Sequence, residues 1–123
     1  ENRMQISNLM TSATVNSSRA VVMGDFNCGF ASSGVDPELE NNSLVLNQPG
    51  FINALSNVSP ECTFCQSNLL NGEEEKSVAI DHILIKGAEL IDANVHFKTP
   101  ITLKDGTQTN LSDHYGVSAK IKL

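Results

Sequence analysis

Basic residues are scarce in this sequence. Lysine and arginine together number 8, against 14 aspartates and glutamates, which gives a formal net charge of -6 at pH 7. Proteins that bind nucleic acid through its phosphates need a positively charged surface, and this composition does not supply one. Nucleic-acid binding by this chain alone is therefore disfavoured, although a bound divalent metal could supply positive charge locally.

Long apolar stretches are also missing. None approaches the roughly 20 residues that a membrane-spanning helix needs, and the chain does not open on a charged and then apolar leader with a cleavage site. With 123 residues, 40% of them hydrophobic, the chain has the size and composition of one small domain with a buried core. No internal repeat, linker or low-complexity segment divides it.

Only three cysteines are present, and an odd number cannot pair completely. Cys62 and Cys65 could form a bridge in an oxidising compartment, or all three, including Cys28, could be buried free thiols. The sequence leaves both alternatives open. A structural zinc site needs about four ligands, and no second pair of cysteines or histidines stands at a suitable spacing.

Apolar residues recur at helical spacing at the start of the chain and predict a helix over residues 1–15. The members of this face are Ile6, Leu9, Met10 and Ala13. A short apolar run over residues 20–23 predicts a strand buried on both faces. A short helix is expected at residues 36–39, and the turn dipeptide Asn71-Gly72 predicts a hairpin with arms at 63–69 and 78–85.

The clearest strand pattern covers residues 78–85, and further strands are expected at 91–97 and 116–123. Alternation puts Asp81 on the same face as Ile83 and Ile85, and His82 on the opposite face. A carboxylate among apolar neighbours needs a partner or a metal. His82 and His96 are expected to be packing or surface residues, and Tyr115 to pack beneath any site.

Three short motifs lie at or beside the ends of these predicted strands. They are Gly24-Asp25-Phe26-Asn27, Ile80-Asp81-His82-Ile83 and Ser112-Asp113-His114. Each is weak alone, because an aspartate after a strand is commonly a turn or helix-cap residue. Together they gather three carboxylates, an amide and an imidazole at strand ends, and this combination predicts a catalytic site.

In this order the three motifs resemble the C-terminal motif set of the endonuclease/exonuclease/phosphatase superfamily, also called DNase I-like. The resemblance covers nearly the whole chain. It implies an α+β fold in which residues 1–123 are a single partial domain, the C-terminal half of a four-layer sandwich, with a mixed, mainly antiparallel sheet and helices on one face. The family's N-terminal half carries its principal metal-binding glutamate, and we expect this chain to begin within the fold.

The resemblance also implies a role for each matching residue in a phosphodiester hydrolase that uses Mg²⁺ or another divalent metal. Asp25 and Asn27 would approach the phosphate and the attacking water. His114 would act as acid or base, oriented by Asp81. Asp113 would be the metal ligand, directly or through water.

Substrate-binding residues and the substrate follow from the same resemblance. Asn27 and Asn68 are expected to bind the substrate. The stretches 62–68 and 80–87 are most similar to the neutral sphingomyelinase branch, which implies a phospholipid such as sphingomyelin. A nuclease or a phosphoinositide phosphatase of the same superfamily is the alternative, and an inactive binding module that retains the site residues is the alternative of another class.

Two expectations concern the chain in isolation. Without the family's glutamate it should be a poor enzyme and a weak metal binder. It should also expose an apolar sheet face and cover it by forming a homodimer. That face would comprise Val21, Met23, Ile83 and Ile85, or their neighbours on the opposite face.

The location of the protein in the cell is left open between bacterial secreted and cytoplasmic. Four N-x-S/T sequons occur, and the last, at Asn110, lies three residues before Asp113, where a glycan would block the predicted site. This placement favours a protein that never meets a glycosylation machinery.

Overall fold

The computed structural model describes residues 1–15, 17–58 and 61–123. Its elements in chain order are α1 (Asn2–Val15), β1 (Ala20–Asp25), α2 (Glu40–Ser43), the 3-10 helix η1 (Leu44–Leu46), β2 (Phe51–Asn53), α3 (Ala54–Val58), β3 (Asp81–Lys86), β4 (Glu89–His96), β5 (Ile101–Thr102), β6 (Gln108–Thr109) and β7 (Gly116–Lys122). The expected α+β fold class is confirmed.

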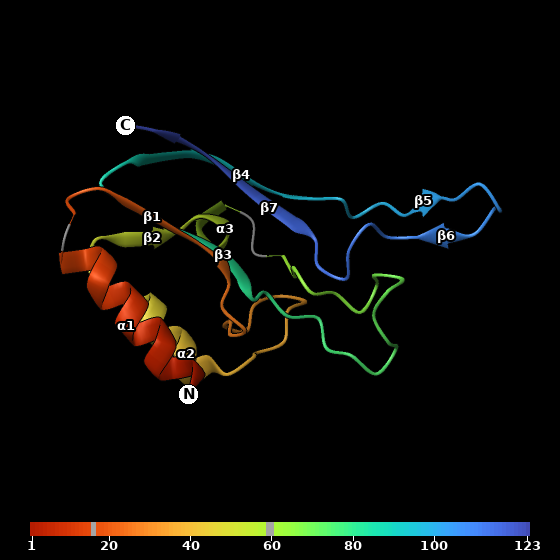
Figure 1. Ribbon diagram of the computed structural model, residues 1–123, viewed down its shortest axis with the longest axis horizontal. Helices are drawn as coiled ribbons and strands as arrows, with labels where there is room; N and C mark the ends of the chain where they lie inside the picture. Colours follow the sequence, from red (N-terminus) through yellow and green to blue (C-terminus); the bar gives the residue numbers. More distant parts are fainter. Residues whose placement is uncertain (16, 59–60) are drawn as a thin grey trace.

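The strands pair in antiparallel fashion in three groups. A three-stranded sheet has the order β1-β3-β2, β4 pairs with β7, and β5 pairs with β6. In Figure 1 the long helix α1, the three-stranded sheet and the β4-β7 pair follow one another from bottom to top, and the β5-β6 hairpin projects away from them. The sheet expected to be single is therefore divided into separate groups.

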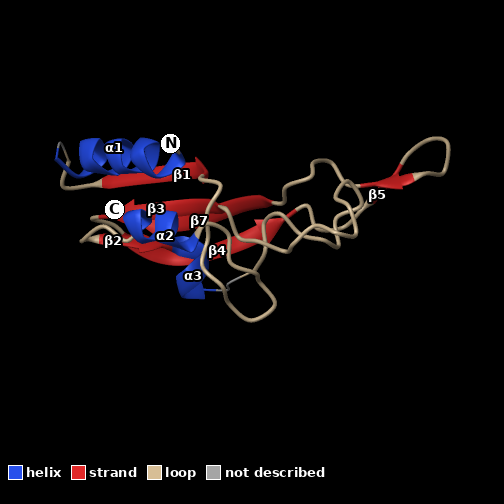
Figure 2. Cartoon of the chain, turned by 90° about the horizontal axis from the view of Figure 1, so that it is seen from below, coloured by secondary structure: helices blue, strands red, loops and turns tan. Residues whose placement is uncertain are grey.

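Strand β3 lies at the centre and buries both of its faces. Leu84, 1% exposed, packs on one face with Ile6 and Met10 of α1 and with residues of η1. On the other face, Ile83 and Ile85 pack with α3 and with the β4-β7 pair. Helix α1 and the short η1 thus cover one face, while α3 lies on the other side of the sheet (Figure 2).

The expectation of an exposed apolar face is wrong for Ile83 and Ile85, which are 6% and 1% exposed. The chain covers them itself, because α3 and the β4-β7 pair pack on them. Their cross-strand neighbours Met23 and Val21 are exposed by 69% and 44%. Strand β1 is at the edge of the described sheet, so its predicted burial on both faces is also wrong. The homodimer stays a prediction.

Three local predictions differ from the structure. Leu9 is 47% exposed and does not share the buried face of Ile6 and Met10, and the side chain of Ala13 lies outside the described residues. Asp36 and Glu38 form bridges to segments that lie beside them, and the helix begins only at Glu40. The hairpin at residues 63–85 is reduced to one antiparallel bridge, between Phe64 and Val78, with the chain between them in turns.

Membrane-spanning helices are not found in the part of the chain that the structure describes, because no helix there is both long and apolar enough.

Candidate active site

Two carboxylates face each other where β1 ends and β3 begins. Asp25 and Asp81 are direct partners in the antiparallel register, so their side chains lie on the same face of the sheet. Like charges directly opposite one another destabilise a strand pair. This placement is favourable only if a positive charge lies beside both carboxylates.

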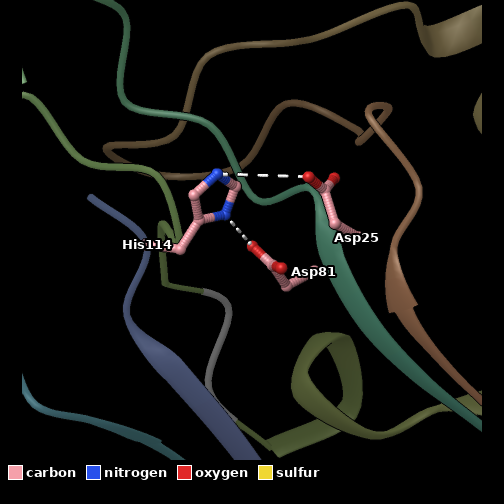
Figure 3. Close-up of side chains that lie close together, drawn as sticks. All are labelled: Asp25, Asp81 and His114. Carbon is pink, nitrogen blue, oxygen red and sulfur yellow. Dashed lines mark hydrogen bonds and ion pairs between the residues drawn. The ribbon is translucent and has the colours of Figure 1, made fainter. Parts of the chain in front are cut away.

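The imidazole of His114 occupies that position. Its Nδ1 lies 2.8 Å from Oδ2 of Asp81, and its Nε2 lies 4.0 Å from Oδ2 of Asp25. Figure 3 shows the ring with one nitrogen directed toward each of the two carboxylates, and His114 lies in the segment that precedes β7. The three motifs, far apart in the sequence, therefore bring three of the predicted catalytic side chains together.

The charge state of His114 follows from its surroundings. Partial burial lowers the pKa of this imidazole, but the hydrogen bond and negative charge of Asp81, with the charges of Asp25 and Asp113, outweigh the burial and raise its pKa above 6.5. Because Nδ1 donates to Asp81, Nε2 is the nitrogen left to exchange a proton with another molecule. The side chain is 27% exposed, so that exchange is open to solvent.

The turn after β1 is built by its own residues. Oδ1 of Asp25 accepts a hydrogen bond from the backbone N–H of Asn27 at 2.8 Å, and Asn27 has a left-handed backbone with φ 51°. Aspartate favours such turns because its carboxylate bonds the backbone two residues on, and asparagine tolerates the left-handed region. Gly24, with φ 148°, adopts a conformation that side chains disfavour. The Asn27 side chain is exposed and borders the same hollow as His114.

Asp113 and Asn68 occupy different positions from the three converging residues. Asp113 is exposed, its Oδ1 lies 3.3 Å from Oγ of Ser112, and it does not belong to the described metal-ligating cluster. Asn68 is 1% exposed, and its Nδ2 donates to the carbonyls of Ser112 and Asp113 at 2.8 and 3.2 Å. Its Oδ1 accepts from the N–H of Leu70. A buried amide bonded in this way cannot reach a substrate, so its position is that of a support for the segment carrying His114.

Thr63, which was not among the residues predicted for the site, connects two parts of it. This side chain is fully buried, and its Oγ1 accepts hydrogen bonds from the N–H groups of Ile80 and Asp81, each at 3.1 Å. Its carbonyl accepts from the N–H of Tyr115 at 2.7 Å. A threonine between two cysteines has no sequence pattern that marks it as a support, because its partners are distant in the chain.

The other histidines and the tyrosine take the structural roles expected of them. His82 is buried, Nε2 donates to the carbonyl of Cys28 at 2.7 Å, and Nδ1 accepts from the amide of Asn53 at 2.9 Å. Burial lowers the pKa of His82, which agrees with this neutral form. His96 is exposed on β4 and bonds a serine hydroxyl on β7, and Tyr115 lies in the core beneath the site.

A hollow of about 520 Å³ opens beside His114. Its lining includes the aromatic ring of Phe64, the amide of Asn27 and three carboxylates. Those carboxylates belong to Glu38, Glu74 and Glu75, with Lys76 beside them. A substrate group that reaches Nε2 of His114 through this hollow would pass an acidic border.

The donor set fits a divalent cation only in part. Ligand atoms of Asp25, Asp81 and His114 lie within 4.8 Å of one another. Nδ1 of His114 and Oδ2 of Asp81 already bind each other, which leaves the exposed carboxylate of Asp25 as the free ligand of this group. Mg²⁺ takes oxygen ligands and keeps several waters, so one or two carboxylates can suffice, but this chain alone would bind it weakly.

Comparison with known proteins gives a structural match without sequence matches. No family model matches the sequence, and no curated protein is significantly similar to it. Among solved structures, the fold matches humanized D. rerio TDP2, tyrosyl-DNA phosphodiesterase 2, which carries 14 mutations, with a TM-score of 0.70 and 12% identity. The match covers 99% of this chain and 48% of that protein, so the chain spans about half its length. At this identity the likeness establishes the fold, which is that of part of a DNase I-like domain.

Replacing Asp81 with asparagine is expected to lower the pKa of His114, because the variant loses both a charged acceptor and a negative charge. A histidine whose pKa is raised by folding stabilises the fold at pH below its ordinary value, and this contribution is lost as the pH rises through the raised value. Asp81→Asn should therefore lose stability mainly in the acid range. An NMR titration of the imidazole protons of His114 in both proteins measures the pKa. An unchanged His114 titration would contradict the pairing.

Proposed function

We propose that this chain carries part of the active site of a metal-dependent phosphodiesterase of the DNase I-like superfamily. The observation that supports the proposal is the convergence of Asp25, Asp81 and His114 from three separate segments. Two carboxylates and an imidazole within reach of one another can move protons and orient water. The fold shared with TDP2, which is named as a phosphodiesterase, supports the same class of reaction for this chain.

His114 acts in this proposal through Nε2. Asp81 holds Nδ1–H, fixes the ring orientation and favours the charged form, in the way a buried carboxylate acts on an imidazole. The raised pKa of His114 keeps a larger fraction protonated near neutral pH. Nε2–H is then available to donate to a phosphoryl oxygen or to give a proton to the leaving group.

In this proposal Asp25 and Asn27 act on the attacking water and on the phosphate. The exposed carboxylate of Asp25, held by the turn that it caps, can orient or deprotonate the attacking water. The exposed amide of Asn27 can donate to a phosphoryl oxygen. Asn68 supports the segment carrying His114 instead of contacting the substrate.

The divalent metal, proposed to be Mg²⁺, supplies positive charge that neutralises the phosphate when it is bound. Asp25 and the exposed Asp113 are the proposed ligands of this chain, and further ligands would come from elsewhere in a longer protein. The net charge of -6 supports a role for this metal, since the chain has few basic side chains of its own to place beside a phosphate.

For the substrate we propose a phospholipid phosphodiester such as sphingomyelin ahead of nucleic acid. The support is electrostatic: the chain is acidic, and carboxylates of Glu38, Glu74 and Glu75 border the hollow beside His114. A polyanion would be repelled by this border, whereas a single phosphodiester with a cationic headgroup would not. A nuclease or a phosphoinositide phosphatase activity is the alternative; the name of TDP2, tyrosyl-DNA phosphodiesterase 2, states a DNA phosphodiester substrate for that protein.

The proposal is tested by assaying the full-length protein that contains this chain. We expect it to hydrolyse bis-p-nitrophenyl phosphate in the presence of Mg²⁺, and the activity to be lost when a chelator is added and restored by excess metal. Sphingomyelin in mixed micelles and a single-stranded oligonucleotide then separate the two substrate classes. No metal-dependent hydrolysis of any of these phosphodiesters would leave an inactive binding module as the better account.

The 123-residue chain alone is expected to turn over far more slowly than the full-length protein, because it offers few metal ligands. The measurement is kcat/KM for the same phosphodiester at saturating Mg²⁺. Equal activity of the two would mean that residues 1–123 hold a complete active site.

A further inference from the structure

A four-residue turn closed by a disulfide lies behind the Asp81 and His114 pair. The structure joins Cys62 to Cys65, with 5.5 Å between their Cα atoms, and leaves Cys28 as a buried free thiol. Of the two alternatives that the sequence left open, the bridge is therefore the one observed. The two residues enclosed by the bridge, Thr63 and Phe64, contact the segments that carry Asp81 and His114.

Thr63 joins the backbone on both sides of the pair. Its Oγ1 accepts from the N–H of Asp81, the residue that orients the imidazole, and from the N–H of Ile80. Its carbonyl accepts from the N–H of Tyr115, next to His114. One fully buried residue thus sets the separation between the start of β3 and the segment that leads into β7.

Phe64 touches the imidazole itself. The two rings lie edge to face, with centroids 5.2 Å apart, and the backbones of Phe64 and His114 form an antiparallel bridge. Phe64 also exchanges two backbone hydrogen bonds with Val78, at 2.8 and 3.0 Å, just before Asp81 in the chain. The ring and the backbone of Phe64 therefore restrict the position of His114 in addition to its hydrogen bond with Asp81.

The disulfide determines how firmly this turn is held. Cys65 is 1% exposed and is packed in the core with Ile83 and Tyr115, while Cys62 is half-buried at the border of the same core. Closing so short a loop removes little entropy from the unfolded chain, so its effect on global stability is small. Its effect on the local backbone is larger, because residues 62–65 can no longer change their turn independently.

We propose that the Cys62–Cys65 turn is a positioning element for Asp81 and His114 and that thiol redox chemistry regulates the site through it. The inference rests on the proposed function. A dithiol reductant is oxidised to its own disulfide, the Cys62–Cys65 bond breaks, and two electrons and two protons pass to the two sulfur atoms. The turn is then free to relax, and Thr63 and Phe64 no longer hold the pair at its hydrogen-bonding distance.

The experiment compares the oxidised full-length protein with the same protein treated with dithiothreitol. Displacements on the order of 1 Å can cost about 100-fold in rate, and we expect reduction to lower kcat by about 10- to 100-fold while KM changes less than about twofold. The NMR signal of the His114 Nδ1 proton reports the pair directly, and we expect it to move or broaden on reduction. Circular dichroism should show the fold retained.

Cysteine variants identify which thiols respond. Cys62→Ser with Cys65→Ser should have the low kcat without reductant and no further response to it. Cys28→Ala, which removes the buried free thiol, should keep the full response. If the double variant does not fold, reduction of the wild-type protein remains the deciding measurement.

The outcomes separate this inference from the proposed function. Full activity and an unmoved Nδ1 proton after complete reduction, verified by thiol titration, would overturn the positioning role. A protein in which reduction moves the Nδ1 proton but which hydrolyses no phosphodiester in either state would support the positioning role and overturn the proposed function.

Discussion

Replacing His114 with alanine is expected to lower kcat/KM for phosphodiester hydrolysis by the full-length protein by about 10²- to 10⁴-fold, the range that a positioned acid or base contributes. The variant removes Nε2, the nitrogen that faces Asp25 and remains available to a substrate. It also leaves Asp25 and Asp81 facing each other without a cation between them. Steady-state kinetics with bis-p-nitrophenyl phosphate and Mg²⁺ measure the effect.

His96→Ala is the matched control for this experiment. His96 is also an exposed histidine with a side-chain hydrogen bond, to Ser118 at 2.6 Å, but it lies on β4 outside the site. We expect its kcat/KM to stay within about twofold of the unsubstituted protein. Similar losses in the two variants would show that damage to the fold, and not the removal of an acid or base, explains the result for His114.

Replacing Ile83 with aspartate is expected to unfold the chain. Ile83 is 6% exposed on β3 and packs against α3 and the β4-β7 pair. A charge buried without a partner costs several kcal/mol, which is on the order of the whole stability of a small domain. Strand alternation also places this carboxylate on the same face as Asp81, which adds repulsion between like charges. Thermal unfolding followed by circular dichroism should show no cooperative transition, or one at a much lower temperature.

Met23→Asp separates this effect from an effect on assembly. Met23 is the cross-strand partner of Ile83 and is 69% exposed on the edge strand β1. The same carboxylate at this position should stay hydrated, and the chain should keep a cooperative transition. If both variants unfolded equally, burial of the Ile83 side chain would not be the cause. If Ile83→Asp stayed folded and only changed the sedimentation behaviour, that face would be an interface between copies.

Local patterns in the chain were sufficient for much of the fold. Helical spacing placed α1, the apolar run at residues 20–23 placed β1, and alternation correctly put Asp81 and His82 on opposite faces of β3. The short elements were less predictable. Residues 36–39 carry a helix-start pattern, but bridges from Asp36 to Val78 and from Glu38 to Gly29 keep Asp36 and Glu38 out of a helix.

Burial of strand faces was predicted less well, because it depends on what packs over a strand. Val21 and Met23 have the same apolar character as Ile83 and Ile85, yet the first two are exposed and the second two are buried. The difference is that the β4-β7 pair and α3 pack over β3, whereas β1 is at the edge of the sheet. Nothing in the run of residues 20–23 indicates where a pair of strands, one some 70 and the other nearly 100 residues later in the chain, will pack.

The candidate site also contains residues that local patterns predicted and residues that they did not. The chemistry of Asp25, Asp81 and His114 could be predicted from residue types at strand ends, because each motif is local. Asp25 and Asp81 lie in one sheet, whereas His114 reaches them from the segment before β7, which pairs with β4. The residues that support them could not be predicted, since Asn68 and Thr63 act through hydrogen bonds to residues 17 to 52 positions away. Residue types thus specified which groups can move a proton. Tertiary packing alone decided which of them lie within a hydrogen bond of one another, because that distance depends on contacts between segments that no local pattern encodes.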